Sequence, residues 1–316
     1  MGSPNGVVKG VAIEGWGGQA VALLASMRPK QWTKNLIIFL PVAFTLNLSW
    51  DPKDLSDVGS IFSKVGAAFG LFCLLSSAVY LINDIVDLER DRRHPKKRSR
   101  PLASGRLSVQ TALVVALVFL AVAIPLAFYL ELTFGAVATA YVAIMVLYIF
   151  LLRRLVILDV FTIAGGFVAR AAAGAVVISV TPSPWLYVCT ALGALFIGFA
   201  KRRHEVLLLG EGGAEHRDSL EHYTPEMLDH LITMIMPSTL IAYTLYTFSA
   251  ENLPSNHAMM LTIPFVAYGI FRYFFVIHSK NAGGNPEDIL IRDIPILVTI
   301  GLWLATTVAV LWGYRD

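Results

Sequence analysis

Long apolar stretches separated by short polar ones run along almost the whole chain. An α-helix rises 1.5 Å per residue, so about 20 apolar residues cross a hydrocarbon core of roughly 30 Å. Windows of about 19 residues predict nine spans, near residues 35–50, 61–83, 108–129, 132–151, 157–180, 184–200, 231–250, 258–278 and 294–313. The pattern therefore predicts an all-α integral membrane protein with nine transmembrane helices.

The composition agrees with lipid as the main solvent. Of the 316 residues, 56% are hydrophobic and 15% are charged, whereas about 25% charged is usual for a soluble domain. A mean hydropathy of +0.65 excludes a disordered chain. Both cysteines, Cys73 and Cys189, lie in apolar stretches. This excludes a disulfide framework and a cysteine-rich metal site.

Basic residues gather on one side of the predicted membrane. Of the 25 Lys and Arg, only Lys53, Lys64 and Arg315 fall on the other side, and Arg170 and Arg272 lie within spans. Basic loops remain in the cytoplasm, so we predict a multi-pass protein of the plasma (inner) membrane with a cytoplasmic N-terminus and an outer C-terminus.

The same pattern divides the chain into two parts. We expect residues 1–34 to form an N-terminal segment that lies along the membrane interface. Residues 35–316 would form the transmembrane domain, with its polar loops 84–107 and 201–230 in the cytoplasm. Function is therefore sought on the cytoplasmic side.

Three carboxylates follow the second predicted span. Asp84, Asp87 and Asp91 have i, i+3 and i+7 spacing, which places them within an arc of roughly 60° on a continuous helix. Hard oxygen ligands in this arrangement suit Mg²⁺, which is commonly bound by carboxylates together with substrate phosphates. Asn83 lies beside them. The sequence thus predicts a magnesium–diphosphate site with Asp84, Asp87 and Asp91 as metal ligands.

A basic run directly after the acids would hold the remaining charge of such a ligand. It includes Arg92, Arg93, Arg98 and Arg100. The alternative is a helix end whose acids and bases only pair with one another, while the bases fix the topology.

The residues of this region resemble a known family. The string Asn83-Asp84-x-x-Asp87-x-x-x-Asp91 after a second span is similar to the first aspartate-rich motif of the UbiA superfamily of intramembrane prenyltransferases. The longer string NDxxDxExDRxHPxKRxRP resembles the branch that transfers phosphoribose to decaprenyl phosphate. The stretch from Arg28 to Asn35, RPKQWTKN, resembles the same branch.

The loop after the sixth span also favours that branch. Prenyltransferases of the superfamily carry a second aspartate-rich motif there, but this chain has Lys201-Arg202-Arg203-His204-Glu205. One carboxylate and three bases suit a ligand with an additional phosphate. A plain surface pair of Lys201 with Glu205 is the alternative.

The resemblance implies a bundle around a cytoplasm-facing cavity that opens sideways to lipid. It implies transfer of 5-phosphoribose from phosphoribosyl pyrophosphate to a polyprenyl (decaprenyl) phosphate, with Mg²⁺ as cofactor and membrane lipids as surroundings. Catalytic residues would be Asp84, Asp87 and Asp91. The residues expected to bind substrate are Lys30, Lys34, Asn35, Asn83, Arg98, Arg100, Tyr148, Arg154, Lys201, Arg202 and Glu205.

Two other functions stay open from the sequence. A prenyltransferase acting on an aromatic acceptor would share the fold and the first motif, and it predicts acids at positions 201–205. A transporter or scaffold would leave the clustered carboxylates unexplained. We expect no nucleic-acid partner, and the oligomeric state stays open, including a homo-oligomer.

Overall fold

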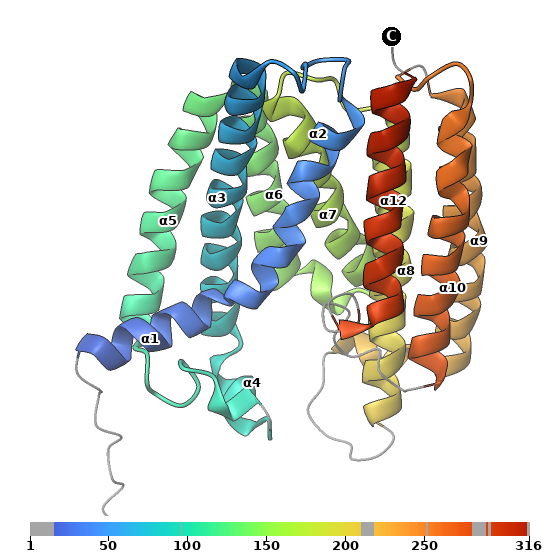
Figure 1. The fold of residues 1–316 in the computed structure, drawn as a ribbon. Helices are drawn as coiled ribbons and strands as arrows, with labels where there is room; N and C mark the ends of the chain where they lie inside the picture. Colours follow the sequence, from blue (N-terminus) through green and yellow to red (C-terminus); the bar gives the residue numbers. More distant parts are fainter. Residues whose placement is uncertain are drawn as a thin grey trace, which may run out of the picture.

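The computed structural model describes residues 16–95, 97–209, 218–250, 252–279, 289 and 292–314. These residues are almost entirely helical (Figure 1). The elements are α1 (Trp16–Met27), η1 (Pro29–Phe39), α2 (Leu40–Phe44), α3 (Leu55–Val86), α4 (Leu88–Arg93), η2 (Lys97–Ser99), α5 (Val109–Leu130), α6 (Leu132–Phe150), η3 (Leu152–Arg154), α7 (Leu158–Val177), α8 (Pro184–Leu209), η4 (Asp218–His222), α9 (Pro225–Ser249), η5 (Ala258–Thr262), α10 (Ile263–Ser279) and α12 (Ile294–Gly313).

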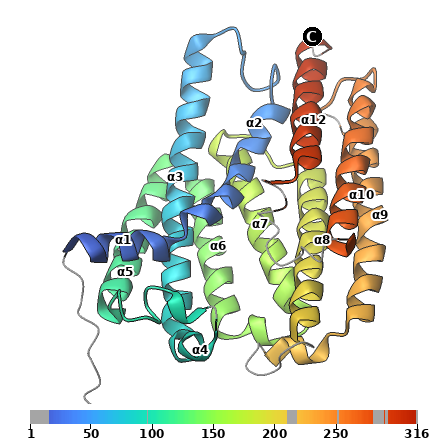
Figure 2. The same ribbon diagram turned by 60° about the horizontal axis from the view of Figure 1, so that its bottom comes forward.

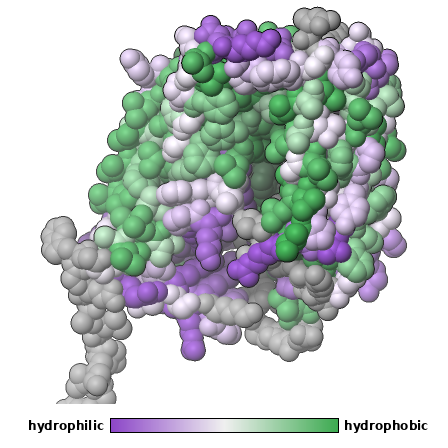
Figure 3. All heavy atoms as spheres, viewed as in Figure 1, coloured by the Kyte–Doolittle hydropathy of each residue, from purple (hydrophilic) through white to green (hydrophobic). Residues whose placement is uncertain are grey.

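The structure confirms an integral membrane protein built from helices. Within the described part of the chain, 8 helical segments are long and apolar enough to cross a membrane. They correspond to the predicted spans from the second onward. Their apolar side chains form a band between polar ends in the space-filling view (Figure 3).

The first predicted span, residues 35–50, differs from the expectation. The chain here forms the 3₁₀ helix η1 and the short α2, which ends at Phe44. Pro41 lacks a backbone N–H, so a regular α-helix cannot pass through it without losing a hydrogen bond. Figure 1 shows η1 and α2 running from the α1 end of the bundle to the end where α3 begins. The segment follows the bundle without being a continuous α-helix, so a count of nine transmembrane helices is not confirmed.

Helix α1 lies across the end of the bundle, near the ends of α3 and α5 (Figures 1 and 2). Its Ala22 is buried in a cluster with Ala78, Leu81 and Leu107. This position suits the interfacial role predicted for residues 1–34, of which residues 1–15 lie outside the described part.

A close approach between η1 and α7 fixes where η1 lies. A Cβ at Gly174 would lie 2.1 Å from the Ile38 carbonyl oxygen, so only glycine permits this contact. Ile38 is fully buried in the main core, together with Phe72 and Tyr141. The broken segment is therefore packed into the bundle and holds its N-terminal residues next to α3 and α7.

Candidate functional site

Two of the three predicted carboxylates are joined by one guanidinium group. The Arg100 Nη1 atom lies 3.2 Å from Asp84 Oδ1 and 2.6 Å from Asp91 Oδ2. Arg28 also donates to Asp84. Both carboxylates are only 2% exposed, and buried carboxylates are stable only when paired.

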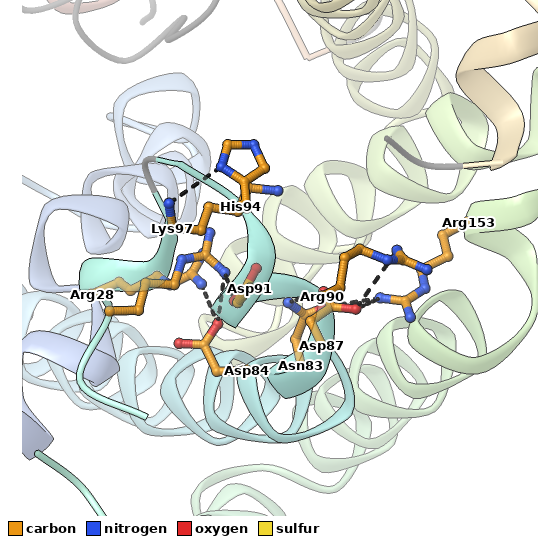
Figure 4. A network of polar contacts seen from close by, with 10 residues as sticks. Arg28, Asn83, Asp84, Asp87, Arg90, Asp91, His94, Lys97 and Arg153 are labelled. Atoms are coloured by element: carbon orange, nitrogen blue, oxygen red, sulfur yellow. Dashed lines mark hydrogen bonds and ion pairs between the residues drawn. The ribbon is translucent and has the colours of Figure 1, made fainter. Parts of the chain in front are cut away.

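Asp87 points to a different set of partners, so the prediction of one continuous acidic face is wrong. Helix α3 ends at Val86, Asp87 caps it with φ −89° and ψ 4°, and α4 begins at Leu88. The Asp87 carboxylate accepts from Arg153 at 2.8 Å and from the Asn83 amide at 3.2 Å. The change of helix axis at this position separates Asp87 from the pair bridged by Arg100 (Figure 4).

The donor set is nevertheless chemically suitable for Mg²⁺. Three carboxylates and the Asn83 amide supply hard oxygen atoms within a short stretch. In the described part of the chain, no three His, Cys, Asp or Glu side chains converge on one metal position. Each carboxylate is oriented toward an arginine instead, and Mg²⁺ binding by these residues stays a prediction.

The segment η1 connects the acidic cluster, which consists of Asp84, Asp87 and Asp91, to a large cavity. At its start, Arg28 has a left-handed conformation (φ 55°) and reaches Asp84. Trp32 donates from its indole N–H to the Ser77 hydroxyl at 3.1 Å. Lys34 lies further along η1 and lines this cavity. The segment that begins at Arg28 thus places Arg28 beside the acidic cluster and Lys34 at the cavity.

The cavity has a volume of about 1160 Å³ and lies among η1, α2, α7, α8, α9 and α12. Its basic lining residues are Lys34, Lys201 and Arg202. Most of the remaining lining is apolar, including Phe44, Phe167 and Trp303. The hollow is visible between apolar side chains in Figure 3. Such a cavity suits a ligand with a long apolar tail and an anionic head.

Arg202 is held by two carboxylates on the wall of this cavity. Its Nε donates to Asp159 Oδ2 at 2.7 Å, and its Nη1 donates to Glu205. The Arg202 side chain is only 2% exposed. Arg202 and Glu205 were both expected to bind substrate. Instead, the Arg202 guanidinium is already paired with carboxylates, and Glu205 is one of them. Lys201 lines the same cavity and is half-buried.

Asn35, a predicted substrate-binding residue, is fully buried and is not among the residues that line the cavity. Its amide oxygen accepts from Arg170 Nε at 2.7 Å. Arg170 also donates to the Tyr141 hydroxyl at 2.8 Å. This contradicts a direct substrate contact by Asn35, since its side chain links η1 to α7 in the interior.

The other predicted residues are spread more widely. Lys30, Arg98 and Arg154 are exposed on η1, η2 and η3. Tyr148 is buried near the C-terminal end of α6. Arg28 and Tyr223 were not among the predicted site residues, although Arg28 contacts Asp84, and Tyr223 contacts Asp159, the partner of Arg202. No spacing rule links them, because the contacts join distant parts of the chain.

Comparisons with known proteins find relatives over most of the chain. Residues 24–210 match the UbiA prenyltransferase family. The chain is 32% identical over 303 residues to a decaprenyl-phosphate phosphoribosyltransferase from Mycolicibacterium smegmatis, with 92% of each chain covered. It is 32% identical over 286 residues to the protein of that name from Mycobacterium tuberculosis, covering 90% of this chain and 92% of the relative.

A solved structure shares the fold. The UbiA homologue from Archaeoglobus fulgidus, determined with GPP and Mg²⁺ bound, aligns with a TM-score of 0.69 at 19% identity. The alignment covers 92% of this chain and 99% of that one.

Proposed function

Because the chain belongs to the UbiA prenyltransferase family, we propose that it transfers 5-phosphoribose from phosphoribosyl pyrophosphate to a polyprenyl phosphate. The bond between the anomeric carbon and the diphosphate oxygen breaks, and a bond from that carbon to an oxygen of the lipid phosphate forms. The observation that carries the proposal is the 32% identity, over nine tenths of both chains, to relatives named decaprenyl-phosphate phosphoribosyltransferase.

The cavity supports a lipid acceptor. Its apolar wall would accommodate a polyprenyl tail, Lys34 lies where the anionic head of the lipid could be bound, and Lys201 would contact the phosphorylated donor. An acceptor phosphate is already ionised near pH 7, so the reaction requires no strong general base. These side chains would bring together two anions that otherwise repel each other.

The acidic cluster supports use of a divalent metal. Asp84, Asp87 and Asp91 would hold Mg²⁺, which neutralises charge on a departing diphosphate when bound. The A. fulgidus homologue was solved with Mg²⁺ bound, which supports use of a divalent metal by this fold. Arg28, Arg100 and Arg153 already contact these carboxylates. They would remain beside the donor and bind its phosphate oxygens.

We also propose that the protein lies in the plasma (inner) membrane, and the basic asymmetry of the sequence supports its orientation there. The end of the bundle that carries α4 and η2 would face the cytoplasm, where a soluble phosphorylated sugar donor is available. The C-terminal end of α12 lies at the opposite end (Figure 1), as this orientation requires.

A prenyl transfer to an aromatic acceptor is the competing function. Its donor also carries a diphosphate, so the first motif does not separate the two reactions. The stretch 201–205 separates them better, because three bases stand where a second acidic cluster is expected.

The two functions are distinguished by offering both substrate pairs to the same purified protein in parallel. One mixture contains radiolabelled phosphoribosyl pyrophosphate with polyprenyl phosphate, and the other contains labelled prenyl diphosphate with an aromatic acid. We expect lipid-extractable product only in the first mixture. Product only in the second would replace the proposed function by prenyl transfer.

A further inference from the structure

The connection between α6 and α7 contains a strained residue. Ile157 has φ 69° and ψ −49°, and the Leu158 N–H donates to the Val156 carbonyl oxygen at 2.8 Å. These features define a γ-turn of the positive-φ form, which is rare. A β-branched residue is a genuine outlier at positive φ. Surrounding contacts must therefore hold the turn in place.

Tyr223 provides such a contact from the segment after η4. Its hydroxyl oxygen accepts from the Ile157 N–H at 2.6 Å, and its O–H donates to Asp159 Oδ1 at 2.8 Å. Burial, together with the Asp159 carboxylate, raises the pKa of Tyr223. The hydroxyl therefore stays protonated and makes both bonds over the ordinary pH range.

The strained turn lies between Arg153, which contacts the acidic cluster, and Asp159, which contacts the cavity wall. On its N-terminal side, Arg153 donates to Asp87 at 2.8 Å. On its C-terminal side, Asp159 accepts from Arg202 at 2.7 Å. A relaxation of Ile157 to negative φ would redirect the chain on both sides of the turn and displace both contacts.

We propose that Tyr223 is a positioning residue of the transfer reaction. By holding the turn at Ile157, it fixes Arg153 against Asp87 and Asp159 against Arg202, so the acidic cluster and the cavity wall keep one relative placement. The inference rests on the proposed function for its activity readout. The link between the turn at Ile157 and these two contacts is the same for any donor that carries a diphosphate.

The test compares Tyr223→Phe with two double variants, Tyr223→Phe/Ile157→Gly and Tyr223→Phe/Ile157→Ala. Glycine adopts positive φ without strain, whereas alanine keeps a Cβ and the strain. Tyr129→Phe is the matched control, because Tyr129 is 90% exposed at the end of α5. The readouts are kcat for phosphoribosyl transfer per folded protein, and affinity for inorganic diphosphate with Mg²⁺, measured by the shift in melting temperature.

We expect Tyr223→Phe to lower kcat by about tenfold or more, as small misplacements of reacting groups do, and to weaken diphosphate binding. Ile157→Gly should restore most of both losses in that background, and Ile157→Ala should not. Equal rescue by glycine and alanine would overturn the proposal. A melting-temperature loss with normal kcat and normal diphosphate affinity would overturn it too, since that is a purely structural role.

The diphosphate readout separates this inference from the proposed function. If the wild-type protein binds diphosphate but transfers no phosphoribose, the function is wrong. The ranking of the variants by diphosphate affinity then still decides whether Tyr223 positions the site.

Discussion

Arg153 and Asp87 are 66 positions apart in the chain, yet the guanidinium Nη1 lies 2.8 Å from the carboxylate oxygen. Their side chains are only 6% and 12% exposed. This contact attaches the α6–α7 connection to the end of α3, where the aspartate-rich motif begins.

Arg153→Met should destabilise the protein and reduce its activity. Without Arg153, Asp87 keeps only the Asn83 amide at 3.2 Å and Arg90 at 3.9 Å, so the loss should be at most that of breaking a buried ion pair, about 3–5 kcal/mol. The measurements are the melting temperature in detergent and the rate of transfer. Arg92→Met is the control for the melting temperature, because Arg92 pairs with Glu89 on the surface, where a pair contributes about 1 kcal/mol or less. Equal effects of the two variants would contradict a special role for the Arg153–Asp87 pair.

Asp87→Asn should lower turnover by at least roughly 10²-fold, the scale expected for loss of one electrostatic stabiliser. The substitution keeps the size of the side chain and removes the negative charge that would bind Mg²⁺. Turnover is measured across a series of Mg²⁺ concentrations. Full activity of the variant in EDTA would show that the carboxylate does not act through a metal.

Lys201→Ala should raise the KM for phosphoribosyl pyrophosphate, because Lys201 lines the basic end of the cavity. The KM for polyprenyl phosphate should change much less. A fall in kcat as well would indicate a contact that tightens as diphosphate leaves. A defect selective for the lipid would instead assign Lys201 to the acceptor.

Gly174→Ala should displace η1 from α7, since the new Cβ would lie 2.1 Å from the Ile38 carbonyl oxygen. Overpacking of this kind typically costs about 1–3 kcal/mol. Gly70→Ala in α3 is the matched control, because a Cβ there meets no atom within 4 Å. Thermal unfolding should show a loss for Gly174→Ala and no loss for Gly70→Ala. A Gly174→Ala protein as stable as wild type would mean that η1 is not held by this contact.

A cysteine placed at Ser99, on η2, should react only with reagents that reach the cytoplasm. The expectation follows from the basic residues that flank it, which orient membrane proteins. Labelling from the outer face of intact cells would reverse the predicted orientation.

Much of the fold is predictable because lipid requires continuous apolar helices, and these are visible in the sequence. The first span shows where that reasoning fails. Pro29 and Pro41 indicate a break, but the 3₁₀ geometry of η1 depends on tertiary contacts such as Gly174 with Ile38.

The site was only partly predictable for a similar reason. Local spacing identified Asp84, Asp87 and Asp91, since they lie close together in sequence. It could not show that the helix turns at Asp87, or that Arg202 is occupied by Asp159. Tyr223 carries no local signal, because its role depends on a backbone conformation at Ile157 in a distant segment.

We propose that the protein transfers phosphoribose, and not a prenyl group, to a lipid phosphate. The most direct test uses phosphoribosyl pyrophosphate carrying one label in the ribose and another in the diphosphate, incubated with polyprenyl phosphate and the purified protein. We expect the ribose label to enter the organic phase while an equal amount of diphosphate label is released into the aqueous phase. Ribose label that stays entirely in the aqueous phase, with folded and Mg²⁺-supplied protein, would contradict it.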